Sequence, residues 1–180
     1  MPYPAKTSRE AILAAALTLL EEQDAPLTMR TLAATLGLQA SSLYRHYADR
    51  ETLEEAVADE AARMLMDDIA AASAGLPPHE ALRVAGQRYL LFAHRHPRLY
   101  ALIHQPRPPA AATPGPGKDL WNLLLGLVGA VTGRPDDTAA VVAFWCFLHG
   151  YVGLESSGQF GLSGPGDAFE RGLEALVRGL

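Results

Sequence analysis

The sequence predicts an all-α protein of about nine helices. Alanine and leucine are abundant, and 49% of the residues are apolar, enough for a sizeable buried core. No stretch alternates between apolar and polar residues in the way that a strand with one buried face does. Apolar residues instead recur every three to four positions, and prolines or glycines separate one such stretch from the next. Together these observations favour helices over any fold that contains a sheet.

Four helices are expected before residue 75, and several have a recognisable start or stop. Thr7 and Glu10 have the spacing of a capping box, so the first helix should begin there. Gly37 can end the second helix, because glycine adopts left-handed backbone angles at little cost. Asp49 is expected to cap a long fourth helix, whose apolar stripe continues to Ile69. The predicted ranges are residues 7–22, 28–36, 40–47 and a fourth helix that follows Asp49.

Five more helices are expected after the Gly-Leu-Pro-Pro break at residues 75–78. The first of them has an apolar face from Leu82 to Ala93, and Pro97 should end or kink it. Residues 105–117 carry five prolines and two glycines, a composition that predicts a surface loop. The two helices after this loop are apolar nearly all round and are therefore expected to be buried. The remaining predicted ranges are residues 99–104, 120–131, 138–154 and 167–180.

The charge is distributed unevenly along the chain. The formal net charge is −5, but the first 50 residues hold five basic and five acidic side chains. The acidity therefore lies in residues 51–180, and a DNA-facing surface in the first part is not excluded by charge.

Cysteine content and hydropathy indicate where the protein works. The single cysteine, Cys146, excludes a disulfide within the chain and fits a reducing compartment. The first ten residues are polar and show no secretory signal. The longest apolar run, residues 139–148, has half of the ~20 residues that a membrane span needs. We therefore expect a cytoplasmic protein that does not enter a membrane.

The strongest functional signal is a helix-turn-helix pattern between residues 32 and 43. Ala33 is small enough for a second helix to approach the first, and Gly37 provides the turn between them. Leucines on both sides would fix the angle at which the helices cross. The outer face of the second helix then carries the side chains of Ser41, Ser42, Tyr44, Arg45 and His46, which suit contacts with phosphates and base edges. The spacing alone also fits an ordinary helical hairpin with a glycine turn.

The wider sequence resembles the TetR family of bacterial regulators. The resemblance is carried by Thr-Met-Arg-Thr-Leu-Ala-Ala-Thr-Leu-Gly-Leu at residues 28–38, Ser-Leu-Tyr-Arg-His-Tyr at 42–47 and Asp-Arg-Glu-Thr-Leu at 49–53. It covers the first ~55 residues, and the number and length of the helices agree over the rest. The resemblance implies a three-helix DNA-binding domain over residues 1–50 and a helical ligand-binding and dimerisation domain over residues 51–180.

The resemblance also implies a set of DNA contacts. In that family the residues that match Thr28 and Arg30 contact the DNA backbone, and those that match residues 39–42 and 44–46 lie at or in the major groove. Arg50 takes the place of a lysine that binds phosphate; it keeps the charge and adds a fork for bidentate contact. Ala40 offers only a methyl group at a position that can carry a longer polar side chain. The implied contacts are Thr28, Arg30, Gln39, Ala40, Ser41, Ser42, Tyr44, Arg45, His46 and Arg50.

A second resemblance lies at residues 145–150, Trp-Cys-Phe-Leu-His-Gly, which is similar to the Trp…His-Gly signature of one group of TetR-family C-terminal domains. Trp145 and His149 are four residues apart and share a helix face. They would form either a wall of an effector pocket or a helix-packing contact in which His149 bonds a buried carbonyl. For other aromatic residues, cavity lining and core packing are equally open. The predicted pocket comprises Tyr89, Phe92, Tyr100, Trp121, Trp145 and His149.

A metal site is not expected, because His94 and His96 are two residues apart on a helix and cannot face one ion together. No cofactor is expected either. An all-helical enzyme is the weakest alternative, since no nucleophile–base spacing or metal motif is visible.

Residues and resemblance together predict a sequence-specific DNA-binding regulator, a repressor that a small apolar organic effector releases from its operator. The expected partners are double-stranded operator DNA and a second copy of the chain, held in a homodimer by the last two helices. The alternatives are a regulator that does not respond to a ligand and a helical interaction module that neither binds DNA nor senses a ligand.

Overall fold

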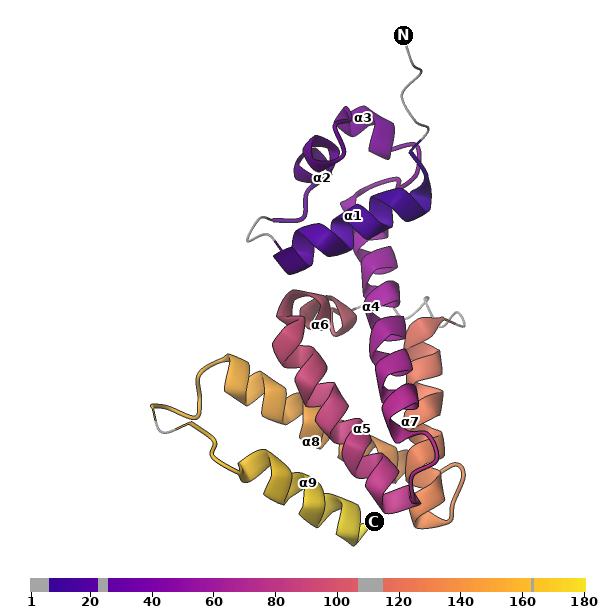
Figure 1. Cartoon of the computed structure of the whole chain (residues 1–180), viewed down its shortest axis with the longest axis vertical. Coiled ribbons are helices and arrows are strands. Elements are labelled where there is room, and N and C mark those ends of the chain that lie inside the picture. The colour runs from indigo at the N-terminus through magenta and orange to yellow at the C-terminus, as the bar shows by residue number, and fades with distance from the viewer. Residues whose placement is uncertain (1–6, 23–25, 107–114, 163) are drawn as a thin grey trace. The chain divides into compact units, whose positions relative to one another are not determined.

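The fold is helical throughout the residues that the structure, a computed structural model, describes: 7–22, 26–106, 115–162 and 164–180. These residues form nine helices and no strand, so the all-α prediction is confirmed. Most of the predicted loop at residues 105–117 lies outside the described part of the chain. The helices of Figure 1 are α1 (Arg9–Glu22), α2 (Met29–Thr35), α3 (Ala40–Leu43), α4 (Arg50–Ser73), α5 (Pro78–Arg95), α6 (Pro97–Ile103), α7 (Pro116–Thr132), α8 (Thr138–Ser156) and α9 (Ala168–Gly179).

Polar side chains cap the starts of two long helices. The backbone N–H of Ala11 donates to the Ser8 hydroxyl at 3.1 Å, which makes Ser8 the cap of α1. The predicted cap at Thr7 is therefore wrong, because the helix begins one residue later than the capping-box spacing suggests. Asp49 caps α4 as predicted, since its carboxylate accepts the backbone N–H of Thr52 at 2.7 Å. This bond and the Thr52 hydroxyl hold the pKa of the Asp49 carboxyl below its ordinary value.

Two helix bounds differ from the prediction by about one turn. α3 ends at Leu43, and residues 44–46 form a turn in which the N–H groups of His46 and Tyr47 still donate to the Leu43 carbonyl. α7 begins at Pro116, four residues before the predicted start, because proline needs no backbone donor in the first helical turn.

The described residues divide by packing into two compact units. The first unit combines Met1–Ala61 with His96–Ala111, and the second combines Ala62–Arg95 with Ala112–Leu180. α4 therefore contributes to both units, and α6 belongs to the first. The division of the chain by function after residue 50 stays a prediction.

In the first unit, α1 packs against α2 and α6, and α2 packs against α3. His96, just before α6, places Nδ1 2.8 Å from the Glu21 carboxylate at the end of α1. The fully buried apolar side chains include Ile12, Ala16, Leu32, Leu43, Leu53 and Val57. This small core gives α2 and α3 a fixed support.

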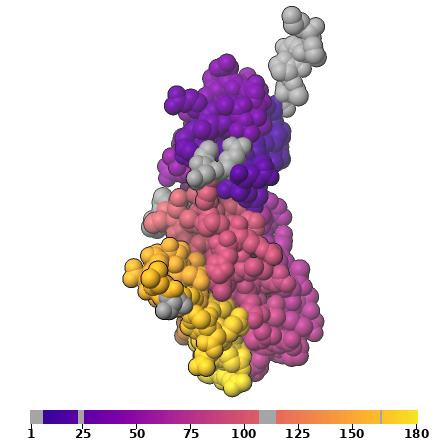
Figure 2. All heavy atoms as spheres, turned by 60° about the vertical axis from the view of Figure 1, so that its left-hand side comes forward, coloured from indigo at the N-terminus to yellow at the C-terminus, as the bar shows by residue number. Residues whose placement is uncertain are grey.

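In the second unit, α5 packs against α7, α8 and α9, and α8 also packs against α7 and α9. Figure 2 shows α9, in yellow, on the surface beside α5. A Cβ atom on Gly86 of α5 would lie 2.7 Å from Cδ1 of Leu173, so glycine allows α5 and α9 to approach closely. Fully buried side chains of this unit include Leu82, Tyr89, Val128, Val141, Phe144, Leu148 and Leu173.

Helix α8 is buried on one face only. Val142, Trp145 and Leu154 keep 41%, 39% and 50% of their surface exposed. The prediction that this helix is buried all round is therefore wrong for a single chain, because α5, α7 and α9 cover only one of its sides. By length and mean hydropathy (1.3) α8 meets the requirement for a membrane span, a test that core helices of globular proteins also pass. The exposed residues between positions 139 and 154, named here the α8 face, are Ala139, Val142, Ala143, Trp145, Cys146, His149, Gly150, Gly153 and Leu154.

Candidate nucleic-acid interface

The turn between α2 and α3 depends on a glycine in a left-handed conformation. Gly37 has a φ of 65°, an angle that side-chain-bearing residues rarely adopt. Its N–H donates to the Ala34 carbonyl at 3.1 Å, and the N–H of Leu38 donates to the Ala33 carbonyl at 2.8 Å. This pair of bonds ends α2 in a Schellman motif and redirects the chain into α3.

Buried apolar side chains fix α2 and α3 from beneath. Leu32 and Leu43 have no exposed surface, and Ala33 and Tyr47 keep only 2% and 1%. Burial also raises the pKa of the Tyr47 hydroxyl. With these residues inside, the remaining side chains of α3 and the turn after it must face outward.

All ten predicted DNA-contacting residues are at least partly accessible. Tyr44 is the largest of them and is 52% exposed. Thr28, Ala40, Ser42 and His46 are half-buried. The exposed members are Arg30, Gln39, Ser41, Tyr44, Arg45 and Arg50.

Two of these residues already have partners within the chain. The Thr28 hydroxyl accepts the backbone N–H of Thr31 at 3.1 Å and so caps α2. Arg50 donates from Nε and Nη2 to the Glu54 carboxylate at 2.8 and 2.6 Å. This pairing was not predicted, although the i,i+4 spacing of the two residues on one helix signals it.

Arg9, which was not among the predicted site residues, contacts the end of this helix-turn-helix. Its Nη1 donates to the His46 carbonyl at 3.1 Å, and its guanidinium carbon lies 4.3 Å from the centre of the Tyr47 ring. No signal in the sequence could place it there, because 37 residues separate Arg9 from His46.

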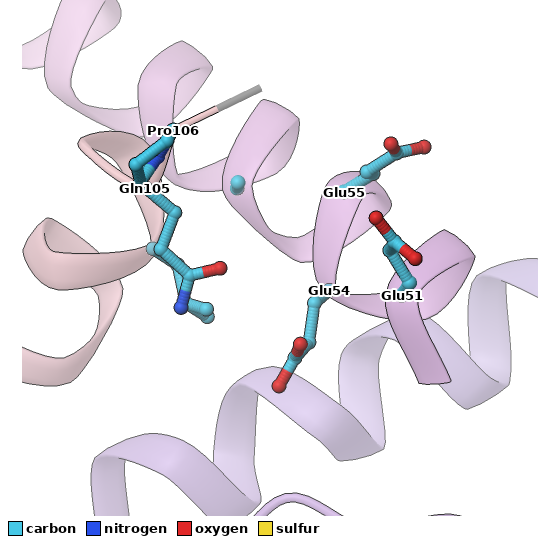
Figure 3. A pocket seen from close by; sticks show the side chains of 7 residues that line it. Glu51, Glu54, Glu55, Gln105 and Pro106 are labelled. Atoms are coloured by element: carbon cyan, nitrogen blue, oxygen red, sulfur yellow. The ribbon is translucent and has the colours of Figure 1, made fainter. Parts of the chain in front are cut away.

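A small acidic cavity lies in the first unit, between α4 and the end of α6. Figure 3 shows Glu51, Glu54 and Glu55 on the first turns of α4, with Gln105 and Pro106 opposite. Its volume of about 40 Å³ is far below the ~300 Å³ of a small ligand pocket. The cavity therefore suits neither DNA nor an organic effector.

The residues of the predicted effector pocket lie in different surroundings. Tyr89 and Phe92 are buried on α5, whereas Trp145 and His149 are exposed on α8. Trp145 meets the Trp121 ring edge-on, with 6.2 Å between ring centres, and lies 6.5 Å from the His149 ring. The structure thus brings Trp121, Trp145 and His149 together at the α7–α8 surface. Tyr100 is buried in the first unit, where its ring centre lies 4.3 Å from that of His104.

A larger groove of about 380 Å³ lies in the second unit between the start of α5 and the end of α9. Its lining is mostly charged, and no residue of the predicted pocket belongs to it. The lining residues are His79, Glu80, Arg83, Glu174, Val177 and Arg178.

Two family models match the chain. The model of bacterial regulatory proteins of the tetR family matches residues 12–57, which include α2, the turn and α3. The model of the tetracyclin repressor-like C-terminal domain matches residues 82–180.

Similar proteins agree with the family models. The uncharacterized HTH-type transcriptional regulator Rv0681 of Mycobacterium tuberculosis is 33% identical in an alignment 166 residues long, which covers 86% of this chain and 73% of that protein. A Rhodococcus sp. RHA1 protein of unknown function has a TM-score of 0.78 at 22% identity, over 100% of this chain and 98% of the other. A TetR variant from Acinetobacter baumannii AYE, solved in complex with minocycline, has a TM-score of 0.70 at 22% identity. The match covers 97% of this chain and 96% of that variant. The chain therefore belongs to the TetR family of bacterial, DNA-binding helix-turn-helix regulators of transcription.

Proposed function

We propose that this protein is a homodimeric repressor, which leaves its operator when a small apolar organic molecule binds to the second unit. The observation that carries the proposal is the α3 surface, defined as the exposed polar side chains of α3 and the turn after it, Ser41, Tyr44 and Arg45. Leu43 and Tyr47 are buried beneath this surface and fix it. Because its target is the operator, we place its action in the cytoplasm.

In this proposal, the exposed side chains of α3 and of the turn after it recognise the base sequence of the operator. Ser41, Tyr44 and Arg45 offer a hydroxyl, an aromatic ring and a guanidinium, groups that bond phosphate oxygens and base edges. Arg30 and Arg50 would bind phosphates beside the groove. Arg50 must exchange Glu54 for a phosphate, so it should contribute less than Arg30.

The dimer is proposed to form through α8 and α9. The α8 face leaves apolar side chains in water, and covering them is favourable by about 25 cal/mol for each Å² buried. A second copy of the chain is the occupant that DNA binding requires, because two half-sites about one helical turn apart are read by a protein with a two-fold axis. α9 lies beside α8 and would extend the interface.

The proposed effector rests on a shared fold. A structural relative holds minocycline, and this chain shares its fold. A ligand would release the DNA only by as much as it prefers the conformation that binds DNA poorly. The predicted pocket residues, however, divide between buried and exposed positions and so do not line one common cavity. This favours, as the second candidate, a DNA-binding regulator that does not respond to a ligand.

The test is a mobility-shift assay with the DNA upstream of the protein's own gene and unrelated DNA as competitor. A complex that resists the competitor is expected, and its absence would overturn the proposed function. Apolar organic compounds are then screened by thermal shift, together with minocycline as the ligand of a structural relative, and compounds that bind are added to the complex. Release of the DNA by a compound that also stabilises the protein supports the repressor; a complex that none of them affects supports the second candidate.

A further inference from the structure

Arg9 contacts the end of the recognition segment, defined as residues 40–47, at three points. Its Nη1 donates to the carbonyl of His46 at 3.1 Å. Its guanidinium carbon lies 4.3 Å from the centre of the Tyr47 ring, within the range of a cation–π contact. The Tyr47 hydroxyl in turn donates to the Arg9 carbonyl at 3.3 Å. The start of α1 and the end of the recognition segment are therefore joined.

The recognition segment needs such support because it is short. α3 has four residues, and Gln39 at its start makes no side-chain cap bond. A helix of this length is unstable by itself, and its last carbonyl groups have no partner within the helix. His46 and Tyr47 both donate to the single carbonyl of Leu43, at 2.9 and 3.0 Å. Tyr44 and Arg45, the predicted base-reading residues, lie inside this last turn.

The Arg9 guanidinium is oriented toward the protein. One of its N–H groups is occupied by the His46 carbonyl, and the group lies over the Tyr47 ring. The neighbouring carboxyl of Glu10 has a pKa below its ordinary value, mainly because its own backbone N–H and the Ser8 hydroxyl bond to it. An ionised Glu10 beside Arg9 weakens the electrostatic attraction of the start of α1 for a phosphate.

We propose that Arg9 is a positioning residue for DNA recognition: it holds the end of the recognition segment so that Tyr44 and Arg45 meet the DNA in a fixed geometry. It acts through His46 and Tyr47 and makes no phosphate contact of its own. The proposal rests on the proposed DNA binding. Without Arg9, the last turn must be ordered when DNA binds, and this ordering lowers the affinity.

The experiment compares Arg9→Met with Arg30→Met, the same substitution at an exposed arginine that is predicted to bind phosphate. In the free protein, Arg9→Met should speed hydrogen exchange at the His46 and Tyr47 amides, and Arg30→Met should not. Operator affinity should fall roughly tenfold or more for Arg9→Met, because each protomer of the dimer loses one cation–π contact and one hydrogen bond. Arg30→Met should reduce the slope of log affinity against log salt by about 0.9 for each phosphate that the variant no longer neutralises, while Arg9→Met leaves the slope unchanged.

Each alternative gives a different result. A lower salt slope for Arg9→Met with unchanged amide exchange would make Arg9 a phosphate contact and overturn the proposal. An equal loss of affinity for operator and unrelated DNA would also overturn it, because a fixed geometry matters most for the specific site. Arg9→Lys keeps the charge but cannot reach the carbonyl and cover the ring with one planar group, so it should restore the affinity only in part. If the unaltered protein fails to bind its operator, the proposed function fails, while amide exchange still shows whether Arg9 orders the segment.

Discussion

The α3 surface and the α8 face are both exposed, yet they differ in composition and in what completes them. On α3 and the turn after it, polar side chains such as Ser41 and Arg45 point outward, while Leu43 beneath them is fully buried. On α8, the outward side chains are mostly apolar or small, and Trp145 and Leu154 remain 39% and 50% exposed. Water solvates the first surface well and the second poorly.

This difference indicates that one chain completes the support of the predicted DNA-reading surface and leaves the α8 face uncovered. The support of α3 is internal to the first unit: the Gly37 turn, the Leu32–Leu43 core and the Arg9 contacts. The α8 face has support from α5, α7 and α9 on its inner side only. A substitution at an exposed position of α3 or the turn after it should therefore affect DNA binding alone, and one on the α8 face should affect dimer assembly first.

The largest effect is expected from Tyr44→Ala and Arg45→Ala. Both side chains are exposed above a buried support, so their removal should leave the fold and the dimer intact. Since a good base contact is worth about 1–3 kcal/mol and a dimer makes it twice, operator affinity should fall by roughly a hundredfold or more. Mobility shift with operator and unrelated DNA measures the loss. Arg95→Ala, an exposed arginine at the end of α5, is the control and should bind normally.

The next largest effect is expected on dimer assembly, and its measurement tests whether a second copy of the chain covers the α8 face. Val142→Asp places a charge in a surface that a second copy should cover, and an unpaired buried charge costs several kcal/mol. Sedimentation should show monomers at micromolar concentration, and operator affinity should fall with the dimer. Ala71→Asp, at an exposed position of α4, should sediment as the unaltered protein does. An undisturbed dimer in Val142→Asp would show that another surface joins the chains.

A smaller effect is expected from variants of Trp145 and His149, and it distinguishes a ligand-binding role of these residues from a role in the dimer contact. If they line a pocket, Trp145→Ala and His149→Ala should raise the concentration of compound that releases the DNA by about tenfold, the effect of ~1.4 kcal/mol. Leu154→Ala removes a residue of the α8 face outside the predicted pocket and should leave that concentration unchanged. Equal responses of all three variants, together with altered sedimentation, would assign the two residues to the interface.

The smallest effect is expected at Arg50, because its guanidinium already pairs with the Glu54 carboxylate. Arg50→Ala should weaken binding to operator and unrelated DNA alike by a few-fold and lower the salt slope by about 0.9 for each phosphate left without its arginine. Glu54→Gln should act in the opposite direction, because it removes the carboxylate that competes with phosphate. A loss of binding in Glu54→Gln would mean that the ion pair orients Arg50 toward its phosphate.

Local patterns were sufficient for the helices and the turn. The Pro and Gly breaks, the 3.6-residue period of apolar side chains and the Gly37 turn all act between near neighbours, so they can be read along the chain. The same holds for the inward direction of Leu43 and Tyr47, which follows from their four-residue spacing. The Thr7 cap failed because neighbouring Ser8 can accept the same backbone bond, and the sequence does not show which residue starts the helix.

By itself, the sequence determined the all-α class, the order of the helices and the outward set of polar residues on α3 and the turn after it, since all of these depend on periodicity and on residues close together in the chain. Only the tertiary structure decided that Arg9 joins the Tyr47 ring across 38 residues and that α8 is covered on one face alone. It also decided that Trp145 and His149 are exposed while Tyr89 is buried. The composition of a helix and the spacing of its apolar residues show how apolar the helix is. Which helices pack against it, and from which side, depends on contacts between segments far apart in sequence, and these arise only when the chain has folded.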